Sequence, residues 1–256
     1  MMHRKTALAL ALTALASLPM IASAQLTANV GLTSNYKFRG QDQDSLASDG
    51  GIRTKTVAPA IQGGFDYAFG ETGWYVGNWN SSVNWLSGNG IESDLYGGYK
   101  FTAGGIGWDL GALTYIYPGN KNGNTTELYG AGTFGPLTLK YSHTVSKDYF
   151  GYAGENSGSG FKGRNTGYFN LAFAQEVAPS LTLKAALGYT RFSSGAKDNF
   201  ELSGVNSPNF VDYGLGVVYD FGAGLSLYGG VQGANKKGVY GGVNKARAIV
   251  SLNKTL

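Results

Sequence analysis

The chain has 256 residues and no cysteine, which excludes disulfide scaffolds, thiolate metal sites and cysteine nucleophiles. It contains 41 glycines and 17 tyrosines but only 14% charged residues, a composition that is not typical of a helical globular domain. The formal net charge is +4, and the basic residues are scattered among acidic ones. Because they form no basic stripe, we do not expect nucleic acid as a partner.

The N-terminal segment 1–24 has the pattern of a secretory signal peptide. Arg4 and Lys5 precede an apolar run that ends in the small residues Ala22-Ser23-Ala24. The run is too short for a membrane-spanning helix and leads directly into this cleavage pattern. We therefore expect export and a mature chain that begins at Gln25, with the formal charge reduced to +2 by the loss of two basic residues.

From residue 25 onward, apolar residues alternate with polar residues or glycine, which is the period of a half-buried β-strand. In segment 181–190 the odd positions are apolar, whereas the even positions include Thr182, Lys184 and Gly188. The remaining chain has no apolar stretch of about 18 residues, so any membrane insertion must use strands. The alternation predicts twelve strands, at 26–40, 57–69, 73–83, 91–102, 105–117, 124–134, 136–147, 165–177, 180–193, 208–221, 224–235 and 244–256.

The predicted connections alternate between tight and long. The tight ones lie at 70–72, 103–104, 135, 178–179 and 222–223, and the long ones near 41–56, 84–90, 118–123, 148–164, 194–207 and 236–243. Short periplasmic turns and long outer loops are typical of bacterial outer-membrane barrels, as are strands of about 10 residues or slightly more. We expect an all-β fold, a transmembrane antiparallel up-and-down β-barrel of about twelve strands over residues 25–256.

A soluble β-sandwich or secreted barrel would show the same alternation. Charges and glycines share the polar face, however, and a wet lumen tolerates them better than a dry core does. Aromatic residues also gather near predicted strand ends, which resembles the two aromatic girdles of membrane barrels. These residues are Tyr36, Phe38, Phe65, Tyr67, Phe69, Trp74, Tyr115, Tyr117, Phe134, Tyr189, Phe192, Phe210 and Phe221.

If the apolar faces meet lipid, the charged residues of the strands point into the lumen. They could form a transverse field that orients a passing small polar solute, or they could pair with one another and plug the barrel. Twelve strands lie between eight, which side chains fill, and sixteen, which enclose an open channel, so we expect a narrow channel that an infolded loop could constrict. The expected pore-lining residues are Lys37, Arg39, Asp66, Glu92, Asp94, Lys100, Asp109, Glu127, Lys140, Lys184, Asp212, Asp220 and Arg247.

The end of the first predicted strand, Ser34 to Gly40, reads SNYKFRG. This segment resembles the SNYxFRG signature of the TorF-type porins of proteobacteria. The resemblance implies an outer-membrane barrel of the porin class and supplies no binding residues. Further similar segments are 59–67, 73–79, 94–99, 115–119, 135–142 and 148–151.

Two alternatives to a passive channel remain open. One is a structural or adhesive barrel without transport. The other is a lipid-modifying hydrolase with a serine–histidine pair. The mature chain has one histidine, His143, on the predicted lipid-facing side, where no serine lies two residues away. We therefore expect no enzyme activity.

Aspartates of the first long loop suggest a calcium site, because calcium prefers oxygen ligands. Asp42, Asp44 and Asp49 lack the EF-hand spacing and its closing glutamate, so we expect neither a metal nor a cofactor. The expected partners are outer-membrane lipids and small polar solutes. A trimer and a monomer would show the same alternation, because a protomer interface is as apolar as a lipid-facing wall.

Overall fold

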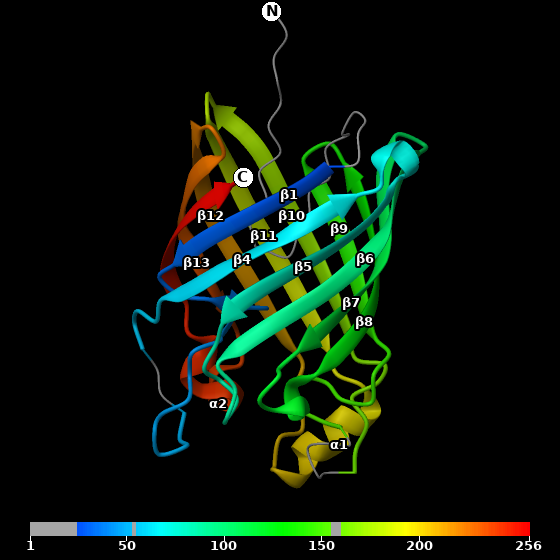
Figure 1. Cartoon of the computed structure of the whole chain (residues 1–256). Coiled ribbons are helices and arrows are strands. Elements are labelled where there is room, and N and C mark those ends of the chain that lie inside the picture. The colour runs from blue at the N-terminus through cyan, green and yellow to red at the C-terminus, as the bar shows by residue number, and fades with distance from the viewer. Residues whose placement is uncertain (1–24, 53–54, 155–159) are drawn as a thin grey trace, which may run out of the picture.

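The computed structural model describes residues 25–52, 55–154 and 160–256; the predicted signal peptide lies outside them. Twelve antiparallel strands close into one barrel (Figure 1). They are β1 (Gln25–Thr33), β4 (Ala60–Ala68), β5 (Trp74–Ser82), β6 (Ile91–Ala103), β7 (Ile106–Ile116), β8 (Thr125–Phe134), β9 (Leu137–Thr144), β10 (Gly167–Ala178), β11 (Leu181–Arg191), β12 (Phe210–Gly222), β13 (Leu225–Ala234) and β14 (Arg247–Thr255).

Each strand pairs with its sequence neighbour, and the barrel closes where β1 pairs with β14, with Asn29 opposite Thr255. Side chains alternate between the two faces of the wall. On β9, Leu137 and Leu139 are exposed on the outside, whereas Thr138 between them is buried inside. The predicted twelve-stranded antiparallel barrel is confirmed.

The outer wall of the barrel is apolar. Leu128 in the middle of β8 is 53% exposed, and Leu215 in the middle of β12 is 59% exposed. A continuous apolar surface of this kind would be costly in water and is the lipid-facing surface of a transmembrane β-barrel. Among the described helices, none is both long and apolar enough to cross a membrane.

The two ends of the barrel differ. Tight turns join the strands at one end, which we call the short-turn end; the first and last barrel strands also begin and finish there (Figure 1). The opposite, long-loop end carries two short α-helices, α1 and α2. The helices and 3-10 turns are α1 (Ser194–Leu202), α2 (Lys237–Tyr240), η1 (Gly70–Thr72), η2 (Lys121–Gly123) and η3 (Gly241–Asn244).

The first barrel strand is shorter than the alternation predicts. It ends at Thr33, and residues 34–46, here called the infolded segment, turn into the barrel and form a small hairpin of β2 (Lys37–Phe38) and β3 (Gln41–Asp42). The turn of this hairpin is Arg39-Gly40, with φ values of 47° and 74°. Two consecutive residues with positive φ form the turn that best matches hairpin twist, so the prediction of a strand through residue 40 is wrong.

The prediction of two lipid-facing aromatic girdles is wrong for about half of its residues. Phe65, Trp74, Phe134 and Phe221 point outward, as a girdle requires. Tyr189, near the long-loop end of β11, also points outward. Six other aromatic residues from the long-loop end point inward instead, because their positions fall on the inner face of a strand or belong to the infolded segment. These inward residues are Tyr36, Phe38, Tyr115, Tyr117, Phe192 and Phe210.

Candidate functional site: the barrel lumen

The long-loop half of the lumen is closed by packed aromatic side chains. We call Phe38, Tyr115, Tyr117, Tyr149, Phe150, Phe192, Phe210 and Tyr240 the aromatic cluster. Phe38, at the tip of the infolded segment, lies 5.3 Å from the ring of Tyr115 and 5.1 Å from that of Phe150, measured between centroids. The first pair packs edge to face and the second is tilted, and both contacts stabilise the inward position of the segment.

An ion pair holds the tip of the infolded segment against the wall. Nη2 of Arg39 donates to both carboxylate oxygens of Glu127 on β8, at 2.9 and 2.7 Å, and Nη1 donates to the hydroxyl of Tyr149 at 2.9 Å. The guanidinium also lies 4.1 Å from the ring centre of Tyr168. Burial raises the pKa of Tyr149 to about 12, so its hydroxyl stays protonated at neutral pH. Both predicted residues face the interior, but they neutralise each other.

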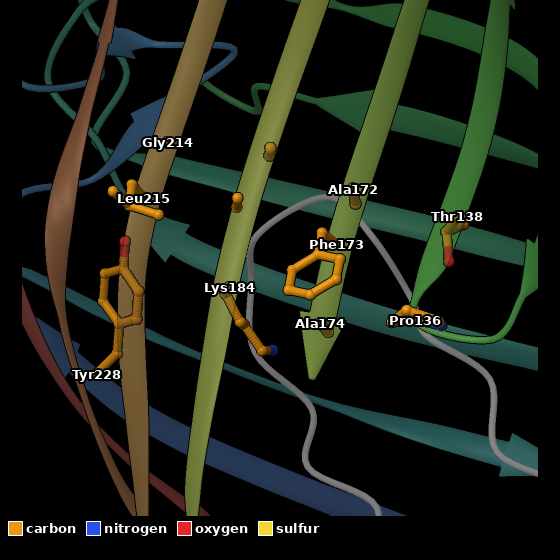
Figure 2. Close-up of a pocket in the computed structure, with 11 residues that line it drawn as sticks. Pro136, Thr138, Ala172, Phe173, Ala174, Lys184, Gly214, Leu215 and Tyr228 are labelled. Atoms are coloured by element: carbon orange, nitrogen blue, oxygen red, sulfur yellow. The ribbon is translucent and has the colours of Figure 1, made fainter. Parts of the chain in front are cut away.

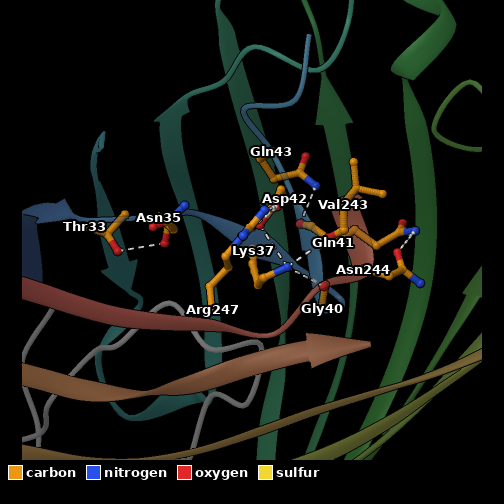
Figure 3. A network of polar contacts seen from close by, with 10 residues as sticks. All are labelled: Thr33, Asn35, Lys37, Gly40, Gln41, Asp42, Gln43, Val243, Asn244 and Arg247. Atoms are coloured by element: carbon orange, nitrogen blue, oxygen red, sulfur yellow. Dashed lines mark hydrogen bonds and ion pairs between the residues drawn. The ribbon is translucent and has the colours of Figure 1, made fainter. Parts of the chain in front are cut away.

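A second polar network fixes the base of the same hairpin (Figure 3). Oδ1 of Asp42 forms an ion pair with Nζ of Lys37 at 2.9 Å, and Oδ2 accepts a hydrogen bond from Nη2 of Arg247 on β14 at 3.0 Å. Lys37 also donates to the backbone carbonyls of Gly40 and Val243. The two predicted luminal cations Lys37 and Arg247 therefore share the carboxylate of Asp42, a residue predicted to lie in the first long loop.

Tyrosine hydroxyls, which are not among the predicted pore-lining groups, donate hydrogen bonds to most of the predicted inward carboxylates. Glu92 on β6 is fully buried and accepts from Tyr36 at 2.7 Å and from Tyr117. Tyr168 donates to Asp212 at 3.1 Å, and Tyr96 donates to Asp66 at 2.7 Å. The alternation along the chain assigns these tyrosines to the inner face, and this pattern could have identified them as partners of the carboxylates. Two predicted residues differ: Asp94 keeps a buried oxygen without a partner, and Asp220 accepts from the amide of Gly222.

In the short-turn half, two lysines flank a tyrosine–aspartate unit. Tyr75 donates to Asp109 at 2.7 Å, and its hydroxyl also contacts that of Tyr129. The ammonium of Lys100 lies 4.5 Å from the ring centre of Tyr75, and that of Lys140 lies 4.0 Å from the ring centre of Tyr129. Cross-strand register places Lys100 opposite Asp109, then Asp109 opposite Ala131, and Ala131 opposite Lys140. These predicted residues therefore form one row across four strands.

Lys184 occupies a separate hollow in the short-turn half (Figure 2). Small residues surround it on the inner wall, among them Ala172, Ala174, Ala186 and Gly214, and Tyr228 lies on the β13 side. About 470 Å³ around these residues is free of protein atoms, and part of this volume is open solvent. In the described part of the chain, Lys184 makes no ion pair and remains partly exposed.

A second hollow lies between the infolded segment and the wall formed by β1, β4, β13 and β14, with about 370 Å³ free of protein atoms, open solvent included. Its lining is largely polar and includes Lys37, Gln62, Gln232, Ser251 and Asn253. Polar side chains around a cavity of this kind can replace part of the hydration of a small solute.

The residues considered for other chemistry are already engaged by protein groups. Nδ1 of His143 lies 3.0 Å from the hydroxyl of Tyr141, and Nε2 lies 3.2 Å from Oδ1 of Asn165, so no serine contacts its ring in the described structure. Asp44 pairs with Lys55 at 2.9 Å. Within the described ranges, no group of three acidic or histidine side chains could hold a metal ion.

An apolar outer wall, a polar inner wall and an infolded first loop define a transmembrane β-barrel with a polar lumen. The chain matches the sequence profile of the bacterial family Gcw_chp, described as proteins of unknown function, over residues 20–255, and it belongs to that family. No curated protein matches it. The fold is similar to the KdgM porin in complex with disordered oligogalacturonate (TM-score 0.52, 10% identity, 90% of this chain and 97% of that chain). It is also similar to the NanC porin (TM-score 0.50, 12% identity, 90% and 98%).

Proposed function

We propose that this protein is an outer-membrane porin that lets small polar solutes diffuse through its lumen. The observation that carries the proposal is the contrast between the two faces of one wall: apolar outside, and lined by lysines, carboxylates and hydroxyls inside. A barrel that served only as an anchor would gain from an apolar interior, since buried polar groups are costly. The resemblance of residues 34–40 to the TorF-type porins supports the same function.

The proposed orientation follows from the unequal ends. In outer-membrane barrels, short turns face the periplasm and long loops face the exterior. The infolded segment and the aromatic cluster then lie at the outer mouth, and Lys100, Lys140 and Lys184 lie near the periplasmic mouth. We further propose that residues 1–24 are the signal peptide that directs export.

Luminal lysines give this channel a preference for anions. Lys100, Lys140 and Lys184 each occupy the second inward position from the short-turn end of their strand. Among the described residues, none of the three forms an ion pair, whereas Asp66 and Asp109 at equivalent positions accept tyrosine hydroxyls. Glu176 and Asp220 lie nearer the rim, and their negative charges oppose the positive potential of the lysines. Each of these two carboxylates accepts a hydrogen bond from a backbone amide. A luminal potential of about one kT would favour anions over cations severalfold.

Planar-bilayer recording of the refolded mature protein tests the proposal. We expect discrete openings and a reversal potential, under a potassium chloride gradient, of the sign set by chloride. Replacing Lys100, Lys140 and Lys184 with glutamine should move that potential toward zero. The matched control replaces Lys236, Lys237 and Lys245, which are exposed on the outer loops. Silence from verifiably folded wild type and from folded Glu127→Gln protein would contradict a channel, and an unchanged potential would contradict the lysine filter.

The second candidate function is a structural or adhesive barrel without transport. The closure of the long-loop half by the aromatic cluster and by the Arg39–Glu127 pair favours it. The two candidates differ in one respect: a channel must conduct when the infolded segment is released, and a structural barrel remains silent. Recording the Glu127→Gln variant beside the wild type therefore separates them.

A further inference from the structure

One patch of the outer wall breaks its apolar pattern. Asn78, the central residue of β5, points outward, as do Asn80 on the same strand and Ser93 on β6. In the central third of every other described barrel strand, each outward residue is apolar, aromatic or glycine. The remaining outward polar side chains of the described wall, such as Thr114, lie near strand ends, where lipid headgroups and water reach.

The polar side chains of this patch are connected to one another. Nδ2 of Asn80 donates to Oδ1 of Asn78, the hydroxyl of Ser93 donates to Oδ1 of Asn80, and Nδ2 of Asn78 donates to the backbone carbonyl of Asp94 at 3.0 Å. An amide has two N–H donors and an oxygen with two lone pairs. Asn78 therefore keeps one N–H and one lone pair that no hydrogen bond among the described residues uses.

Glycines beside the patch would allow another protein surface to come close to it. Gly63 on β4 lies directly opposite Asn80, and Gly97 on β6 lies directly opposite Val76; both glycines are on the outer face. Because glycine has no side chain, nothing projects from the wall at these two points beside the asparagines. Small residues next to polar ones are the combination through which membrane-embedded segments associate, because they allow close approach and interprotein hydrogen bonds.

We propose that the β4–β6 face binds a second copy of this chain, with Asn78 at the centre of the contact. Two copies inserted in the same direction are related by a twofold axis along the membrane normal, so equivalent residues meet at the same depth. An asparagine is its own complement, since the free N–H of one Asn78 can donate to the free lone pair of the other. A hydrocarbon chain offers neither group, and a polar group facing lipid remains costly.

Molar mass in detergent micelles and crosslinking in membranes test this inference, and both are independent of conduction. We expect the wild type to be a dimer. The Asn78→Leu/Asn80→Leu variant should have a dimer dissociation constant that is higher by about tenfold or more. The matched control, Thr114→Val/Thr126→Val, removes an outward threonine pair (hydroxyl oxygens 3.2 Å apart) from β7 and β8 and should remain dimeric. Retention of the dimer by the leucine variant would overturn the proposal, as would a wild-type monomer that carries bound lipid on this face.

Crosslinking locates the contact, because the chain has no cysteine of its own. Val76→Cys places a thiol one outward position from Asn78, and Leu215→Cys places one on β12. Oxidation of native membranes should link only the first variant into dimers. Equal crosslinking of the two variants would show that the contact is not specific to the β4–β6 face.

Discussion

Arg39 and Glu127, which are 88 residues apart in the chain, form a buried ion pair in which Nη2 lies 2.9 and 2.7 Å from the two carboxylate oxygens. The pair joins the tip of the infolded segment to β8. Removing one member leaves the other charge buried without a partner, which costs about 3–5 kcal/mol in comparable pairs. The inward position of the segment therefore depends on this contact.

The Glu127→Gln variant should release the infolded segment while the barrel stays folded. We expect faster tryptic cleavage after Arg39 in detergent and more frequent channel openings than in the wild type. Lys55→Gln is the control, because the Lys55–Asp44 pair is partly exposed and contributes less than about 1 kcal/mol. Equal cleavage rates for Glu127→Gln and Lys55→Gln would contradict the predicted role of the buried pair.

The Gly40→Ala variant should also displace the infolded segment. Gly40 has a φ of 74°, and a Cβ there would lie 2.5 Å from the carbonyl oxygen of Gly233 and 2.7 Å from Cβ of Asp212. Gly50→Ala provides the control, since Gly50 has a φ of 83° but nothing within 4 Å. Both variants carry a backbone strain of about 1–2 kcal/mol, because alanine disfavours positive φ, and only the first adds a steric clash. Protease protection of the segment should fall in Gly40→Ala alone; a similar loss in Gly50→Ala would exclude the clash as its cause.

A charge on the outer wall should impair insertion. Leu128→Arg places a guanidinium in the middle of the lipid-facing side of β8, where such a change costs about 2–4 kcal/mol. Leu202→Arg changes a residue that is 78% exposed at the end of α1, outside the barrel, and should have little effect. The measurement is the urea dependence of folding into lipid vesicles. Equal stability of the two variants would contradict a lipid-facing β8.

Export should remove the first 24 residues. We expect intact-mass measurement of the protein from outer-membrane fractions to give a chain that begins at Gln25. Replacing Ala24 with leucine should block processing, because signal cleavage requires small residues at this site. A mature protein that retains Arg4 and Lys5 would contradict the signal-peptide prediction.

The strands and the facing of most of their residues could be predicted from the sequence. Lys184 lies between Leu183 and Ala185, and this alternation alone assigns it to the polar face of a strand. The count of twelve followed from turns that separate one alternating run from the next, as Gly135 separates β8 from β9. These features are local, since each depends on residues that are neighbours in the chain.

Only the tertiary structure decided what fills the barrel. The run from Ser34 to Gly40 continues the alternation of β1, so nothing local marks the point where the chain leaves the wall. Its inward path depends on Glu127, Tyr149 and Arg247, which closure of the barrel brings to the infolded segment from distant strands and loops. Likewise, Asn78 can be recognised as an exceptional outward polar residue only once it is known which residues of all twelve strands face outward. Sequence alternation determines which face a residue occupies, whereas the contacts on that face depend on how the sheet closes.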